Sequence, residues 1–173
     1  MLLTQVTPNI GVEVSGIDLS KPLGDLHIHP SHREGMNAGD DPEIFAINTP
    51  PDAMQSNGEA WHSDITCEEI PPMASLLYVT KVPENGGGDT MFANMSLAWE
   101  ELSDDLKKFL DGKLAFHAGE LDLRNYGIRL GRGQSYPQAS HPVVIEHPEN
   151  GKPVLFVNPS FTSHIEDIPS WES

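Results

Sequence analysis

The stretch Trp61-His62-Ser63-Asp64-Ile65-Thr66 carries a histidine and an aspartate two positions apart. On an extended strand, side chains alternate between the two faces, so His62 and Asp64 are expected to project to the same side. An imidazole and a carboxylate that converge in this way supply two of the three ligands of a 2-His-1-carboxylate iron site. The pair therefore predicts a metal site on a strand, with a second histidine contributed by another segment.

A histidine followed two positions later by an acidic residue is not specific by itself. About one such pair is expected by chance from 8 histidines and 26 acidic residues in 173 positions, and this chain has four. The other three are His32/Glu34, His147/Glu149 and His164/Glu166. What distinguishes His62 and Asp64 is the sequence around them.

Five sequence blocks, one of which holds this pair, follow one another along the chain. In order they are Gly24-Asp25-Leu26-His27-Ile28-His29-Pro30, Trp61 to Thr66, Gly87-Gly88-Asp89-Thr90, His141-Pro142-Val143-Val144 and Leu155-Phe156-Val157-Asn158-Pro159-Ser160-Phe161-Thr162. In composition and order they resemble the taurine dioxygenase family of iron(II)- and 2-oxoglutarate-dependent oxygenases, which shares the motifs W-H-[ST]-D-x-[TS] and G-G-D-T. The resemblance implies Fe(II) as metal, 2-oxoglutarate as cosubstrate, and hydroxylation of a small sulfonate or carboxylate with release of succinate and CO₂.

The resemblance also implies roles for individual residues. It makes His62 and Asp64 the iron ligands, and Thr90 the hydroxyl that donates a hydrogen bond to the 2-oxoglutarate carboxylate. It places substrate contacts at His29, His32, Asn57 and Ile65. His32 stands where taurine dioxygenases have a tyrosine, and Gly58, next to Asn57, stands where they have an asparagine. These replacements argue against taurine itself as the substrate.

Two family features have no matching position in this sequence. In relatives, the distal iron-binding histidine and the arginine that holds 2-oxoglutarate follow the block that ends at Thr162. The four arginines here, Arg33, Arg124, Arg129 and Arg132, all precede that point. Helices and strands that relatives place between the segments equivalent to Leu23 and Gly24 are also missing. We therefore expect an internally shortened and C-terminally truncated member of the family.

These departures leave alternatives to an active dioxygenase. One is a catalytically incompetent remnant that serves at most as a binding or interaction module. Another is a cupin-like protein that uses His62, Asp64 and a further histidine as a structural metal site. His164 is a weak candidate for the third ligand, since many relatives have an arginine there. Cys67, beside the pair, is interpreted as a small packed hydrophobic residue rather than a ligand.

Composition restricts the class of protein. A length of 173 residues predicts a single domain over 1–173, here a partial dioxygenase-like one. The net charge of −16 argues against nucleic acid or an anionic membrane as partner, because the field would repel phosphate. A single cysteine, the absence of a basic and apolar leader, and the absence of a long apolar run predict a soluble cytoplasmic protein acting on a small molecule.

The pattern of apolar residues predicts mostly strands. Met73 to Lys81 is the longest apolar run and is predicted to be a buried strand. Lys113 to His117 is predicted as a further strand, and Val143 to Glu146 and Val154 to Val157 as a hairpin, because Asn-Gly lies between them. Residues 119–140 are predicted to be loop, and a short strand is predicted at 44–47.

Two helices are expected in the middle of the chain. Ser96 to Leu102 is helical in composition, and Ser103 can cap a following helix that ends near Gly112. Mostly β structure with one or two helices (α+β) predicts a double-stranded β-helix, or jelly roll, which is also the fold that the resemblance implies. Because this sheet is expected to be incomplete, exposed strand edges should favour a homo-oligomer.

Overall fold

The computed structural model describes residues 2–8, 10–16, 18, 47–50, 52–54, 58–125, 129–131, 133–169 and 171–173. The proposed substrate residues His29, His32 and Asn57 lie outside these ranges, as does the strand predicted at 44–47 except for Ile47. The elements in chain order are β1 (Leu2–Gln5), β2 (Val12–Ser15), α1 (Met95–Glu100), α2 (Asp104–Leu110), β3 (Leu114–Ala118), α3 (Gly119–Asn125), β4 (Gln138–Pro142), β5 (Val144–Glu146), β6 (Pro153–Leu155) and β7 (Thr162–Ile165).

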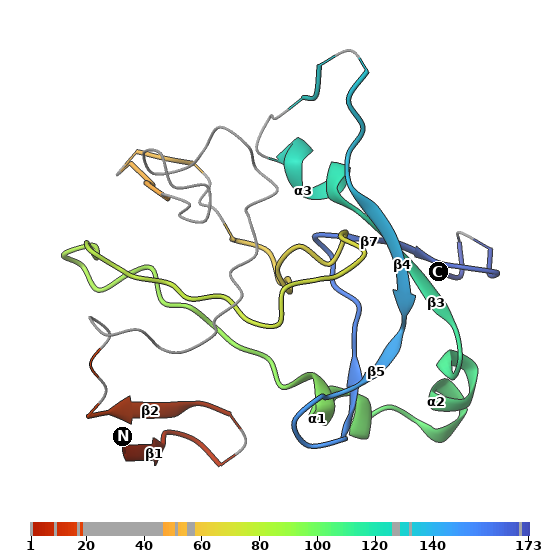
Figure 1. Cartoon of the computed structure of the whole chain (residues 1–173), viewed down its shortest axis with the longest axis horizontal. Coiled ribbons are helices and arrows are strands. Elements are labelled where there is room, and N and C mark those ends of the chain that lie inside the picture. Colours follow the sequence, from red (N-terminus) through yellow and green to blue (C-terminus); the bar gives the residue numbers. More distant parts are fainter. Residues whose placement is uncertain are drawn as a thin grey trace.

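The described strands form three small antiparallel sheets (Figure 1). The largest has the order β4-β3-β7, so that β3 lies between the two later strands. In it Ala115 pairs with His141 of β4, and Phe116 pairs with His164 of β7. β5 and β6 form the predicted hairpin, and β1 and β2 form a second hairpin near the N-terminus. Residues 61–68, which carry the site described below, are bonded to this sheet through His117 of β3 and His141 of β4.

The two helices start where the sequence predicts. The Asn94 side chain accepts hydrogen bonds from Ser96 N and Leu97 N at the start of α1, at 3.1 and 3.0 Å. Ser103 Oγ accepts from Leu106 N at 3.3 Å and so caps α2. Gly112, just beyond α2, has φ +70°, a conformation that glycine adopts at little cost.

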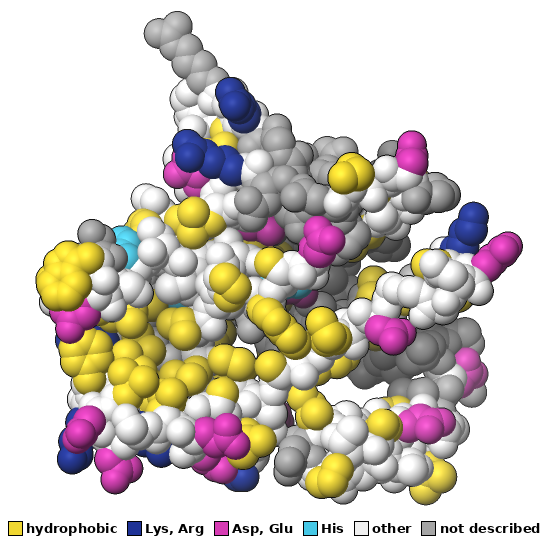
Figure 2. All heavy atoms as spheres, turned by 180° about the vertical axis from the view of Figure 1, so that it is seen from behind, with side chains coloured by type: hydrophobic (Ala, Val, Ile, Leu, Met, Phe, Trp, Pro, Cys, Tyr) yellow, Lys and Arg dark blue, Asp and Glu magenta, His cyan; other side chains and the backbone are white. Residues whose placement is uncertain are grey.

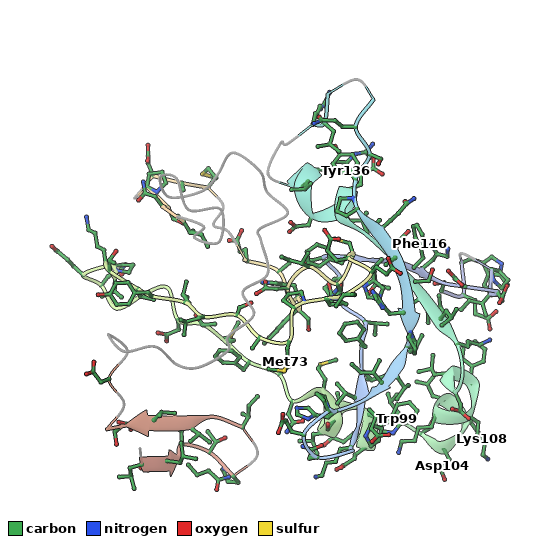
Figure 3. The ribbon with its side chains drawn as sticks, in the orientation of Figure 1. Met73, Trp99, Asp104, Lys108, Phe116 and Tyr136 are labelled. Atoms are coloured by element: carbon green, nitrogen blue, oxygen red, sulfur yellow. The ribbon has the colours of Figure 1, made fainter. Side chains whose placement is uncertain are left out.

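The hydrophobic core is small and lies between the helices and the sheets. Its buried members are Leu110 of α2, Ala115 of β3 and Val143, which follows β4. Trp99 of α1 packs against this cluster (Figure 3). Leu102, Val144, Leu155, Val157 and Ile165 also contact it. Few side chains thus stabilise the arrangement of β3, on which the site depends.

Two predictions about single elements are wrong. The loop predicted for 119–140 is wrong at both ends, because residues 138–140 begin β4 and residues 119–125 form the helix α3. Glu120 and Asp122 in the first turn of α3 and Arg124 in its last favour the helix dipole. The Glu120–Arg124 ion pair at 2.6 Å supports the same helix. The buried strand predicted for Met73 to Lys81 is also incorrect: this run is extended but pairs with no strand in the described part of the chain.

Residues 70–92, which we call the apolar arm, leave the sheets as two extended legs joined at Gly86 (yellow to green in Figure 1). Gly86 has φ +74° and its N–H donates to Pro83 O at 3.1 Å, which makes the turn at the tip. Leu76 and Tyr78 are 81% and 85% exposed. The other exposed apolar residues of the arm are Ile70, Met73, Leu77, Val79, Val82, Met91 and Phe92. Figure 2 shows how much hydrophobic surface one face of the molecule presents.

The architecture is mostly strands with few helices, as expected from the sequence. Three separate sheets of two or three strands do not make up a jelly roll, so the closed double-stranded β-helix remains a prediction. Within the described ranges, no helix combines the length and the apolar character needed to cross a membrane.

Candidate metal site

His62 and Asp64 converge as predicted. His62 Nε2 lies 3.3 Å from Asp64 Oδ1, and both side chains are partly exposed. They do not converge on a strand, as the sequence predicted, because residues 61–63 have no strand partner and 64–67 form a turn. Within this turn Ile65 has φ +52°, a left-handed conformation that is uncommon for a β-branched residue. The turn, rather than the alternation of a strand, brings the imidazole and the carboxylate together.

Neighbouring groups orient both donor side chains. His62 Nδ1 lies 2.7 Å from Ala60 O. Because a carbonyl oxygen only accepts, Nδ1 carries the hydrogen and Nε2 is left to bind a metal or share a proton with Asp64. Ser75 Oγ donates a hydrogen bond to the other carboxylate oxygen, Asp64 Oδ2. Gly58 is also required here, since a Cβ at that position would lie 3.3 Å from His62 Cε1.

These two donors fit one metal ion. Two atoms that each bind a metal at about 2.1 Å, at right angles to each other, are about 3 Å apart. The observed 3.3 Å between Nε2 and Oδ1 is close to that spacing. The hydrogen bond with Asp64 raises the pKa of His62, while partial burial acts in the opposite direction. Because a metal binds the neutral imidazole, metal and proton compete for Nε2.

The described residues do not complete the ligand set. No group of three or more histidine, cysteine or acidic side chains among them could hold a metal ion. His164 pairs with Phe116, the residue next to His117 on β3 (Phe116 is labelled in Figure 3). Because neighbours on a strand face opposite sides, His164 lies on the other face of the sheet from His117. Thr90, the residue predicted to bind 2-oxoglutarate, is exposed on the apolar arm.

A buried hydrogen-bond cluster lies directly behind the metal pair, and the sequence analysis did not predict it. His117 of β3 is 0% exposed, and its Nδ1 lies 2.9 Å from Thr66 Oγ1 and 3.4 Å from Thr162 Oγ1. Asn158 Nδ2 donates to Thr66 Oγ1 at 3.1 Å. The burial of His117 could have been predicted from the alternation of side chains along β3, because this alternation places His117 on the same inward face as Ala115.

Two further contacts hold the same segment against the sheet. His141 of β4 donates from Nε2 to Glu68 O at 2.9 Å. Cys67 is fully buried, which confirms that it packs as a small hydrophobic residue, and burial raises the pKa of its thiol to about 12. A Cβ on Gly119 would lie 3.2 Å from Cys67 Sγ and 3.0 Å from Pro137 Cγ, so a larger residue would require these neighbours to shift.

The cluster makes stability depend on pH. Burial, and then the neighbouring His141, lower the pKa of His117 from 6.5 to about 4. A histidine whose pKa is lower in the folded state stabilises that state fully above pH 6.5, and this contribution is lost as the pH falls towards 4. We expect the melting temperature of the wild type to fall more steeply between pH 6.5 and 4.5 than that of His117→Gln. Equal slopes in thermal scans of the two proteins would contradict a neutral, buried His117.

Comparison with known proteins places this site in a family. The model of the family described as "Taurine catabolism dioxygenase TauD, TfdA family" matches residues 17–173. An alpha-ketoglutarate-dependent sulfonate dioxygenase of Saccharomyces cerevisiae is 30% identical over 165 residues, which are 90% of this chain and 39% of that protein. An alpha-ketoglutarate-dependent sulfate ester dioxygenase of Pseudomonas putida is 32% identical over 113 residues, 60% of this chain and 37% of that protein.

Two solved structures are also similar to this chain. A taurine dioxygenase from Burkholderia xenovorans has a TM-score of 0.60 at 33% identity, over 80% of this chain and 43% of that one. A second structure from Burkholderia xenovorans has a TM-score of 0.74 over 99% of this chain and 70% of that one, and at 24% identity it bears on the fold alone. The chain thus spans less than half the length of the two named relatives and of the taurine dioxygenase. It belongs to the taurine catabolism dioxygenase TauD, TfdA family, and this membership implies Fe(II) and 2-oxoglutarate as cofactor and cosubstrate.

Proposed function

We propose that this chain provides part of the active site of an Fe(II)- and 2-oxoglutarate-dependent dioxygenase that hydroxylates a small sulfonate or carboxylate. The observation that carries the proposal is the pair His62 Nε2 and Asp64 Oδ1, 3.3 Å apart, with the Ala60 carbonyl directing Nε2 towards the metal position. The sulfonate and sulfate ester dioxygenases among the relatives support an anionic sulfur compound as substrate.

Bound iron and 2-oxoglutarate would supply the oxidising chemistry, and the protein would supply position and protection from water. His62 and Asp64 would hold two adjacent coordination positions, with Ser75 keeping the carboxylate in place. Thr90 would donate a hydrogen bond to 2-oxoglutarate. A third metal ligand and a positive partner for the cosubstrate are still required, and the described residues do not supply the third ligand.

The substrate side of the proposal rests on position in the sequence. Ile65 directly follows Asp64, and its left-handed conformation turns the chain at this point. His29 and His32 are proposed to contact the substrate because they occupy positions that the family uses for this purpose, and Asn57 is proposed because it is adjacent to a third such position.

A catalytically incompetent remnant is the second candidate. It is favoured by the two-donor site and by the exposure of Thr90 on the apolar arm. In this case the chain would act at most as a binding or interaction module.

An anaerobic titration with Fe(II) and 2-oxoglutarate distinguishes the two candidates. We expect the visible charge-transfer band of the chelated complex in the wild type and in His147→Ala, which removes a partly exposed histidine of the β5–β6 turn. The band should be lost in His62→Ala. A wild type without any band would exclude the dioxygenase proposal for this chain and favour the remnant. A band that persists in His62→Ala would mean that the metal lies elsewhere.

A further inference from the structure

We propose that Thr66, held by His117 and Asn158, is a positioning residue that keeps the Asp64 carboxylate beside His62. The three side chains come from segments far apart in the sequence and meet at one hydroxyl oxygen, Thr66 Oγ1. The consequence for metal binding rests on the proposed function above. The restraint of the turn that carries Asp64 is independent of that function.

The directions of the hydrogen bonds in the cluster follow from its donors. The Asn158 side chain accepts from Phe161 N through Oδ1 at 2.9 Å, so its Nδ2 group faces Thr66 and donates to Oγ1. The Asn158 backbone N–H donates to Thr162 Oγ1 at 2.9 Å. Each threonine oxygen therefore accepts one N–H and has its own hydrogen left to donate. Both hydroxyls lie within reach of His117 Nδ1, whose single lone pair accepts the closer of them, Thr66 Oγ1 at 2.9 Å against 3.4 Å for Thr162.

This arrangement uses only one side of the His117 ring. With Nδ1 as acceptor, the neutral ring carries its hydrogen on Nε2, and this buried atom has no hydrogen-bond partner among the described residues. The His117 ring lies beside two other rings, with centroid-to-centroid distances of 5.4 Å to His141 and 5.8 Å to Phe156. A buried N–H without a partner is costly. An apolar residue would avoid this cost, so what the histidine contributes here is the Nδ1 acceptor for Thr66.

The turn that carries Asp64 needs such a restraint. Ile65 lies between Asp64 and Thr66 and has φ +52°, and a β-branched residue keeps this conformation only when its surroundings impose it. Ser160 Oγ donates to Trp61 O at 3.4 Å before the metal pair, and His141 bonds to Glu68 O after it. Thr66 lies between these two anchors and next to the strained residue. Ser75 holds the Asp64 carboxylate itself, whereas the Thr66 hydroxyl holds the turn behind it. Loss of this hydroxyl should therefore release the turn and, with it, the backbone of Asp64.

The test compares substitutions that differ only in the hydroxyl. Thr66→Val removes Oγ1 at nearly constant volume, and Thr66→Ser retains it. Thr162→Val is the matched control, because it removes the other hydroxyl that reaches His117 Nδ1 but lies on β7, away from Asp64. Two readouts are used: amide hydrogen exchange of residues 61–68 in the metal-free protein, and the affinity for Mn(II) alone, measured from the EPR signal of the free ion.

We expect Thr66→Val to speed exchange in residues 61–68 about tenfold and to weaken Mn(II) binding about tenfold, the effect typical of losing a residue that orients a ligand. Exchange in β3 and β4 should not change. Thr66→Ser should restore both values to within about twofold of the wild type. Thr162→Val should alter exchange near residues 158–162 and leave residues 61–68 and Mn(II) affinity unchanged.

The outcomes separate this proposal from the proposed function. If the wild type does not bind Mn(II) but Thr66→Val still loosens residues 61–68 selectively, the positioning role stands and the metal site fails. If Thr66→Val changes neither readout, or loosens β3 and β4 equally, Thr66 does not position Asp64. Should Thr66→Val fail to fold, Thr66→Ala, which also removes the hydroxyl but adds no bulk next to His117, decides the question by the same readouts.

Discussion

Leu110→Ala is expected to lower the free energy of unfolding by about 2 to 4 kcal/mol. Leu110 is 8% exposed and is one of the few fully packed side chains of the core, together with Ala115 and Val143. Truncation removes buried methyl groups and leaves a cavity that the small surrounding cluster cannot fill. Since small domains are stable by only about 5 to 15 kcal/mol, this is a large share of the total. Urea denaturation followed by circular dichroism measures it.

Leu106→Ala on the same helix is the matched control. Leu106 is 41% exposed, so the same chemical change should cost less than about 1 kcal/mol. Helix propensity does not separate the two variants, because both exchange leucine for alanine within α2. If the two variants proved equally stable, the core would not lie where the structure places it.

The apolar arm is expected to make the protein self-associate. Its extended backbone pairs with no strand of the described chain, and its side chains present a long apolar surface to water. Unpaired extended backbone and exposed apolar area both favour contact with another copy. We expect oligomers in sedimentation velocity at moderate concentration and 0.15 M salt, where the repulsion from the net charge of −16 is screened. A clean monomer would contradict this.

Leu76→Lys combined with Tyr78→Lys tests whether the apolar arm is the contact. The two residues lie two positions apart on an extended leg and so on one side of it. Met54→Lys combined with Trp171→Lys adds the same charge at two exposed residues outside the arm. The arm variant should shift the distribution towards monomer, and the control should not. A shift of similar size in both variants would assign the change to charge rather than to the arm.

Some elements were predictable because their signals are local. Ser103 lies directly before α2, and its hydroxyl caps the helix whatever the rest of the chain does. The Asn150-Gly151 turn joins β5 and β6 for the same reason, with Gly151 at φ +68°. The helix α3 was missed because the glycines of 127–133 outweighed the charge pattern of the residues before them.

The candidate site was only partly predictable. His62 and Asp64 were identified from their motif, and the structure brings them together, but through a turn at Ile65 rather than on a strand. Thr90 remains a prediction, as do the substrate residues outside the described ranges. The sequence motifs gave no role to His117, and the structure places it in the buried cluster with Thr66.

The amino-acid sequence by itself determined the family, the Ser103 cap of α2 and the β5–β6 hairpin, and it predicted His62 and Asp64 as metal ligands, because each depends on residues close together in the chain. Only the tertiary structure decided that Thr66, His117 and Asn158 share one hydroxyl, since 51 and 92 positions separate Thr66 from its two partners. It also decided that the apolar arm is exposed. An apolar run becomes a buried strand only when other strands pair with it and cover it, and the structure places none of the described strands beside this one.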